Sequence, residues 1–127
     1  MSLDRDDDTP TPKKRRKPCP ATMLSLRHLR ADGWIAEKVE YRESTGGRGF
    51  GMTHDFLGFI DIIAIRGRET LAVQTTSASN VASRTRKIAE SPYVGAVREA
   101  GWGIVVHGWW QEKPGARWVL KVDRDLS

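Results

Sequence analysis

Residues 54–65 read HDFLGFIDIIAI and residues 71–76 read LAVQTT, and these two stretches decide the fold of the chain. Both are rich in apolar residues, with the β-branched isoleucine and valine that favour strands. The segment between them contains Gly67, a turn-forming residue. We therefore predict two buried strands joined as a hairpin, with Asp61 opening the apolar part of the first strand and Gln74 interrupting the second.

The elements on either side of this hairpin predict an α/β domain in the order α-β-β-β-α-(α)-β-β. Before the hairpin we expect a helix at 21–31, a strand at 34–42 and a glycine-containing loop at 43–53. After it we expect a helix at 81–90 with Ser79-Asn80 as its N-cap, a short helix at 92–100, and strands at 102–110 and 117–122. The last strand is expected to be an antiparallel edge strand.

The charge of the chain is compatible with nucleic acid as a partner. The net charge is +5, from 21 Lys and Arg residues against 16 Asp and Glu residues. Residues 1–20 are rich in charge and proline, so we predict a disordered basic tail, followed by a single domain at 21–127. Five consecutive basic residues in the tail are candidates for contact with phosphates, and a solvated tail that aids solubility is an equally good alternative: Lys13, Lys14, Arg15, Arg16 and Lys17.

The lone cysteine, Cys19, excludes an intramolecular disulfide and a cysteine-based zinc site. No apolar run approaches the roughly 20 residues that span a bilayer, and the N-terminus lacks the apolar core of a secretory signal. These features favour the cytoplasm of a bacterium or of a phage-infected cell.

Asp61 is the first candidate for a functional residue. A carboxylate that opens a buried strand must be hydrogen-bonded, paired or bound to a cation, because burying a bare charge is costly. The alternative is an aspartate that caps a turn at the wet end of the strand. Asp55 is a second candidate, since Gly58 permits a bend that brings it closer to Asp61.

Gln74 and Thr76 lie two residues apart on one strand, so both side chains point to the same face. The amide oxygen of glutamine is a ligand that Mg²⁺ accepts. On spacing alone, a polar pair hydrogen-bonded across the sheet is the better reading of these residues.

The array around Asp61 and Gln74 resembles the PD-(D/E)xK nuclease superfamily, and especially its Holliday-junction-resolvase-like small phage and bacterial proteins. The matching residues are GFIDIIAI at 58–65, LAVQTT at 71–76 and the basic helix that follows. The resemblance implies an αβββαβ restriction-endonuclease-like core, a mixed central sheet flanked by helices, with an extra C-terminal edge strand. It also implies a metal-dependent endonuclease that hydrolyses phosphodiester bonds in DNA.

Carried over by position, Asp61 takes the place of the metal-binding aspartate, Gln74 that of the second acid and Thr76 that of the lysine. Arg84 or Lys87 on the following helix would then supply the positive charge. The first predicted helix contains no acid, so Asp55 or Glu40 would complete the site around Mg²⁺ or Mn²⁺. With Arg86, the basic side chains of the second helix would hold the DNA backbone.

Other readings stay open. The absence of the usual Glu and Lys motivates a module of the same fold that has lost catalysis and binds DNA or protein, as a phage accessory protein would. A homodimer is a further alternative, as in resolvase-like proteins. His107 is expected to be a core or sheet-face residue, and Trp109, Trp110 and Trp118 to pack against one another rather than stack on bases.

Overall fold

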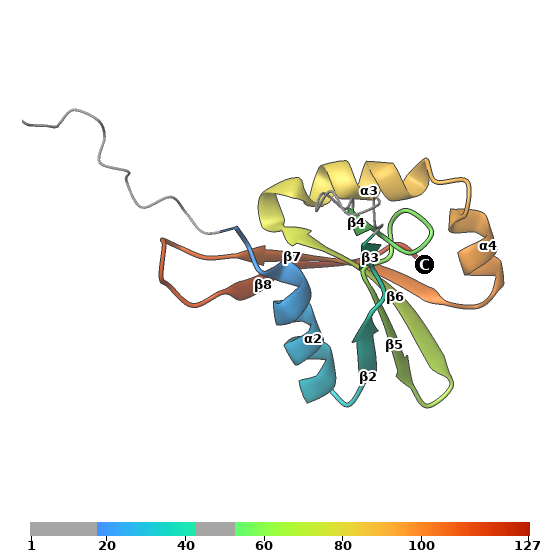
Figure 1. The fold of residues 1–127 in the computed structure, drawn as a ribbon, viewed down its shortest axis with the longest axis horizontal. Coiled ribbons are helices and arrows are strands. Elements are labelled where there is room, and N and C mark those ends of the chain that lie inside the picture. The colour runs from blue at the N-terminus through green and yellow to red at the C-terminus, as the bar shows by residue number, and fades with distance from the viewer. Residues whose placement is uncertain (1–17, 43–52) are drawn as a thin grey trace, which may run out of the picture.

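A computed structural model describes residues 18–42 and 53–127. Five strands form a mixed sheet in the order β2-β5-β6-β7-β8 (Figure 1). Strands β6 and β7 run parallel, and every other neighbouring pair runs antiparallel. The bounds of these strands are β2 (Ile35–Lys38), β5 (Ile62–Arg66), β6 (Glu69–Ser77), β7 (Gly103–Trp110) and β8 (Val119–Asp125).

Helices cover both faces of this sheet, as predicted. One face packs against α2 (Ala21–Ala31), through Leu26 and Leu29. The other face packs against α3 (Val81–Ala89) and α4 (Val94–Glu99), and a 3-10 turn, η1 (Ala78–Asn80), connects β6 to α3. The fold is therefore α/β, with a mixed sheet between two helical layers.

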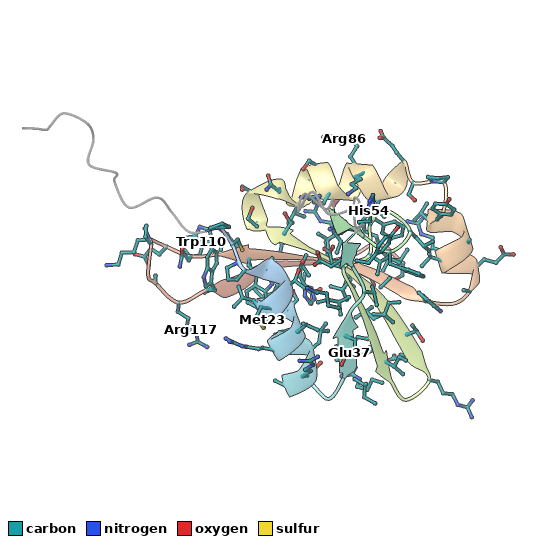
Figure 2. All side chains as sticks on the ribbon, in the orientation of Figure 1. Met23, Glu37, His54, Arg86, Trp110 and Arg117 are labelled. Carbon is teal, nitrogen blue, oxygen red and sulfur yellow. The ribbon has the colours of Figure 1, made fainter. Side chains whose placement is uncertain are left out.

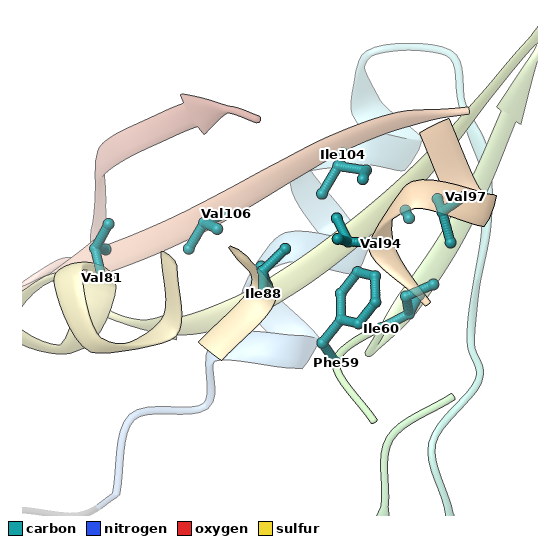
Figure 3. Packing of buried hydrophobic residues seen from close by; sticks show 9 residues of the cluster. Phe59, Ile60, Val81, Ile88, Val94, Val97, Ile104 and Val106 are labelled. Carbon is teal, nitrogen blue, oxygen red and sulfur yellow. The ribbon is translucent and has the colours of Figure 1, made fainter. Parts of the chain in front are cut away.

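The core on the α3 side is a continuous apolar cluster. Ile88 of α3 and Val97 of α4 meet Ile104 and Val106 of β7, with Phe59 filling the space beside them (Figure 3). Gly108 of β7 keeps this layer tight, because a Cβ there would collide with Val81 and lie 3.1 Å from the Cα of Ala78. The start of α3 is thereby held directly against the sheet.

The predicted hairpin is confirmed as β5 and β6, whose turn places Gly67 at a φ of 61°. Asp61 directly precedes β5, and its N–H donates to the carbonyl of Val73 at 2.9 Å. The strands on either side of the hairpin in the sheet are β2, next to β5, and β7, next to β6.

Two details of the predicted secondary structure are wrong. The strand expected at 34–42 divides into β2 and β3 (Tyr41–Arg42), and β3 pairs with β4 (Thr53–His54) in a separate two-stranded sheet. The N–H of Val39 donates to the carbonyl of Asp61, which is where the chain leaves the main sheet. Asn80 precedes α3, but its amide donates to the Ser77 hydroxyl and makes no cap hydrogen bond.

Among the described residues, no helix is both long and apolar enough to cross a membrane.

Candidate functional site

The polar end of β6 lies beyond the start of β5. Ile62, the first residue of β5, pairs with Val73, so the residues of β6 after Val73 have a strand partner only on the β7 side. Asp61 directly precedes β5 and lies where a longer β5 would continue its pairing with β6. The sequence thus places a carboxylate where the backbone of β6 needs an acceptor.

Asp61 is buried and accepts three hydrogen bonds on one oxygen, Oδ2. The donors are the Gln74 side-chain amide at 2.7 Å, the Thr75 backbone N–H at 2.8 Å and the Thr75 hydroxyl at 3.1 Å. These bonds fix the carboxyl group at the junction of β5 and β6. They also satisfy a backbone N–H that would otherwise be unpaired in the interior.

A further bond anchors this group to helix α2. The hydroxyls of Thr22 and Thr75 are 3.0 Å apart. Because the single hydroxyl proton of Thr75 points to Asp61, Thr22 is the donor in this pair. The sequence offered no signal for Thr22 or Thr75, since the contact joins residues far apart in the chain.

Asp55 makes the site acidic. The chain turns at Leu57 and Gly58, both with positive φ, and this turn returns Asp55 toward Asp61, as Gly58 predicted. The pKa of Asp61 is raised to about 7, chiefly by burial and also by a carboxyl–carboxyl hydrogen bond with Asp55 and by the charge of Asp55, against the lowering effect of Thr75. Asp55 and Asp61 are therefore close enough to form an interacting pair of carboxyl groups.

Gln74 leaves one polar atom without a partner. Its Nε2 donates to Asp61, whereas its Oε1 is buried and has no hydrogen-bond partner among the described residues. An unsatisfied buried carbonyl oxygen costs about 1–3 kcal/mol. Such an atom beside two carboxyl groups is an unfilled acceptor position for a donor or a cation.

Basic side chains come from α3. Lys87 Nζ lies 3.8 Å from Asp55 Oδ2, and about half of the Lys87 side chain is exposed. Lys87 and Arg84 both border the cavity at Asp61. Arg86 lies outside this cavity and projects from the far side of α3 (Figure 2).

An open cavity of about 690 Å³ brings the candidate residues together. It lies at one end of the sheet, between the start of α2 and the first turns of α3. The predicted residues that line it are Glu40, Asp55, Asp61, Gln74, Thr76, Arg84 and Lys87. Glu40 borders the cavity without joining the Asp55–Asp61 pair. The five basic residues at 13–17 lie outside the described residues.

The donor types at the site are those of a divalent-cation site. Two paired carboxyl groups and the unpartnered amide oxygen of Gln74 are hard oxygen ligands of the kind that Mg²⁺ and Mn²⁺ take. Within residues 18–42 and 53–127, no three His, Cys, Asp or Glu side chains cluster as a metal-binding group, so this set contains only two acids and an amide. Comparison with protein-family models, curated proteins and solved structures found no match to this chain.

A second buried polar cluster lies beside the site, on β7. The Trp109 indole N–H donates to the Ser25 hydroxyl at 2.8 Å, and this hydroxyl lies 2.9 Å from Nδ1 of His107. The indole N–H and the hydroxyl both have acceptors if Ser25 donates to Nδ1, which leaves the ring proton on Nε2, 3.6 Å from Asp123. Burial lowers the pKa of His107 to about 4. His107 is a core residue, as predicted, and the full burial of Ser25 keeps this group from acting as a nucleophile.

Proposed function

We propose that this protein is a divalent-metal-dependent endonuclease that hydrolyses phosphodiester bonds in DNA, built on a restriction-endonuclease-like core. The observation that carries the proposal is the pair of interacting carboxyl groups, Asp55 and Asp61, in one cavity with the unpartnered oxygen of Gln74. The order of α2, β2, β5, β6, α3 and β7 supports the proposed core. The extra strand β8 follows at the edge of the sheet.

The protein residues would hold the cation in place of a proton. A dication that replaces the proton of Asp61 would relieve the repulsion between Asp55 and Asp61 and give the Gln74 oxygen a partner. When bound, such a cation polarises a phosphate oxygen and lowers the pKa of a bound water. Thr75 fixes the orientation of Asp61, and Thr22 fixes Thr75.

The basic residues of α3 have a separate role. Lys87 is close enough to the acids to contact a phosphate held beside them, and Arg84 borders the same cavity. Negative charge builds on the phosphate oxygens as the bond to the attacking oxygen forms. A fixed ammonium group at this position stabilises that charge. Lys87 would thus take over the role of the lysine whose place in the resemblance is occupied by Thr76.

One observation favours a second function, a DNA-binding module that does not cleave. The Oδ2 atom of Asp61 is already fully occupied by its three hydrogen bonds, so the carboxyl group has a structural role in ending the β5–β6 pairing. In this alternative the basic residues of α3 still contact the DNA backbone, and neither binding nor stability depends on a metal.

Cleavage assays distinguish the two functions. Branched and linear DNA are incubated with the full chain in Mg²⁺ or Mn²⁺, and wild type is compared with Asp61→Asn, which keeps an acceptor for Gln74 and Thr75. The matched control is Asp123→Asn, which removes the exposed acid beside His107. We expect cleavage by wild type and the control, and a loss of at least about 100-fold in Asp61→Asn. Equal cleavage by wild type and Asp61→Asn would refute the nuclease, and metal-independent binding without cleavage would establish the module.

A further inference from the structure

Two further cavities lie along the β7–β8 hairpin, outside the candidate site. The first, of about 560 Å³, lies between α2 and the hairpin and is lined by Arg27, Trp109, Arg117 and Trp118 among others. The second, of about 420 Å³, is lined by Cys19, Ser77 and all three tryptophans of this region, Trp109, Trp110 and Trp118.

These cavities adjoin each other and the candidate site. Trp109 and Trp118 line both of them, and Cys19 and Ser77 line both the second cavity and the cavity at Asp61. The three cavities thus follow one another from the acidic pair along the hairpin to Arg117. We refer to the surface lined by Arg27, Trp109, Trp110, Arg117 and Trp118 as the hairpin groove.

The chemistry of the hairpin groove suits a negatively charged, flat-faced ligand. Among the described residues that line its two cavities there are two arginines and no acid. Neither Arg27 nor Arg117 makes a hydrogen bond or ion pair with another described residue, and both are exposed. Figure 2 shows Arg117 projecting from the chain that joins β7 to β8. Both guanidinium groups are thus available to phosphates.

Two of the three tryptophans of the hairpin groove, Trp109 and Trp110, are held by contacts within the protein. Trp109 is held by its bond to Ser25 and by an edge-on contact with His28 at 6.1 Å. Lys121 lies over one face of Trp110, 4.6 Å from the ring centroid, and 40% of Trp110 is exposed. Rings that are already ordered lose little conformational entropy when a base stacks on them.

We propose that the hairpin groove binds single-stranded DNA, with bases stacked on Trp118 and Trp110 and phosphates held by Arg27 and Arg117. Unpaired bases are required because the bases of a duplex are stacked on one another and present no free face to a tryptophan. This binding is independent of catalysis. It also implies that the substrate is a duplex with a single-stranded arm beside the bond to be cut, and this consequence rests on the proposed function.

The test measures binding of a fluorescent single-stranded DNA of about 12 nucleotides to the full chain by anisotropy, in EDTA and over a range of salt concentrations. Wild type is compared with Arg117→Ala and Trp118→Leu. The control is Arg68→Ala, an exposed arginine in the turn between β5 and β6, at the opposite end of the sheet. All comparisons keep the same basic tail, so differences between variants report on the groove.

We expect Trp118→Leu to weaken binding about tenfold and Arg117→Ala about fivefold, with the salt slope of Arg117→Ala reduced by about one. Arg68→Ala should stay within about twofold of wild type. Circular dichroism confirms that Trp118→Leu is folded, and if it is not, the exposed Arg117→Ala still decides the result.

Three results would overturn the proposal: no binding by wild type, equal losses in Arg117→Ala and Arg68→Ala, or tighter binding of the same sequence as RNA. Cleavage is measured separately, so the two proposals fail independently. If binding depends on the groove but no cleavage occurs, only the nuclease proposal is refuted. If duplexes with a single-stranded arm are cleaved in a metal-dependent way and Arg117→Ala and Trp118→Leu do not change that cleavage, only the proposed substrate is refuted.

Discussion

Two buried polar clusters lie side by side on the central sheet. They differ in whether they open to a cavity, in their acidic residues and in whether their polar atoms have partners. Thr75 of the Asp61 cluster and His107 of the second cluster are paired across β6 and β7. Helix α2 holds both, through Thr22 on one and Ser25 on the other, one turn apart. The Ser25–His107–Trp109 cluster is buried, and its hydroxyl and indole donors both have acceptors. The Asp61 cluster opens to a cavity, contains two acids and leaves the Gln74 oxygen unpartnered.

This difference separates a structural cluster from a functional one. A satisfied polar network in the interior stabilises one arrangement of the core. An unsatisfied oxygen and two neighbouring carboxyl groups cost free energy in the folded protein, and a ligand that supplies positive charge removes that cost. Burial of polar residues alone, which the two clusters share, would not have distinguished them.

The largest expected effect is on the pH dependence of stability at Asp61. Its pKa rises from 3.8 to about 7 on folding, so the folded protein holds a proton that the unfolded chain has released across this range. The contribution of Asp61 to the free energy of unfolding should therefore fall as pH rises from about 4 to 7, by up to about 4 kcal/mol. In EDTA, urea unfolding should show this fall in the difference between wild type and Asp61→Asn, because both proteins keep the opposite contribution of His107. A difference that stays constant across this pH range would contradict the assignment.

The second cluster should show the opposite dependence. The pKa of His107 is lowered to about 4, chiefly by burial, with Asp123 raising it and the charge of His28 lowering it. The unfolded chain takes up a proton first, so the contribution of His107 to stability should decrease as pH falls from 6.5 to about 4, by up to about 3 kcal/mol. The difference in stability between wild type and His107→Gln should show this decrease. As a direct check, the imidazole signals of His107 in NMR spectra should stay those of a neutral ring at pH 5.5, and titration near 6.5 would be inconsistent with the buried cluster.

Removal of Lys87 should affect turnover without affecting the fold. Lys87→Ala takes away the cation nearest the acids and should lower kcat about 100-fold in Mg²⁺, since one group that stabilises transition-state charge contributes that much. Arg86→Ala changes the preceding position of α3, outside the cavity, and should leave kcat within about threefold. Similar kcat values for the two variants would remove Lys87 from the reaction.

Ser25→Ala should be a stability variant only. The hydroxyl accepts from Trp109 and bonds to His107, so its loss leaves two buried polar groups without partners and should cost about 2 kcal/mol. Thr22→Val on the same helix should cost about half as much, but it should also lower kcat because it frees Thr75. The reverse pattern in unfolding and cleavage assays would show that the two clusters have been assigned the wrong way round.

The sequence predicted what is local. The hairpin, the two main helices and β7 follow from runs of apolar residues bounded by turns, and Gly58 correctly indicated the bend that brings Asp55 to Asp61. Asp55, Asp61, Gln74 and Lys87 line one cavity, which is the grouping that the resemblance implied, whereas spacing alone favoured a structural role for Gln74.

Long-range contacts could not be predicted in this way. Thr22 and Thr75 are 53 residues apart and Ser25 and His107 are 82 apart, so no local pattern relates them. The division of residues 34–42 into two strands has the same origin, because the bond from the Val39 N–H to the Asp61 carbonyl joins residues that are distant in the sequence.

The most direct test of the account is whether the Asp55–Asp61 pair binds a divalent cation. Mn²⁺ binding to the full chain, followed by electron paramagnetic resonance without DNA, should show one site in wild type and in Asp123→Asn. The same titration should show no site in Asp61→Asn. Equal Mn²⁺ binding by wild type and Asp61→Asn, or no binding by either, would contradict the central claim that this open cluster is a metal site.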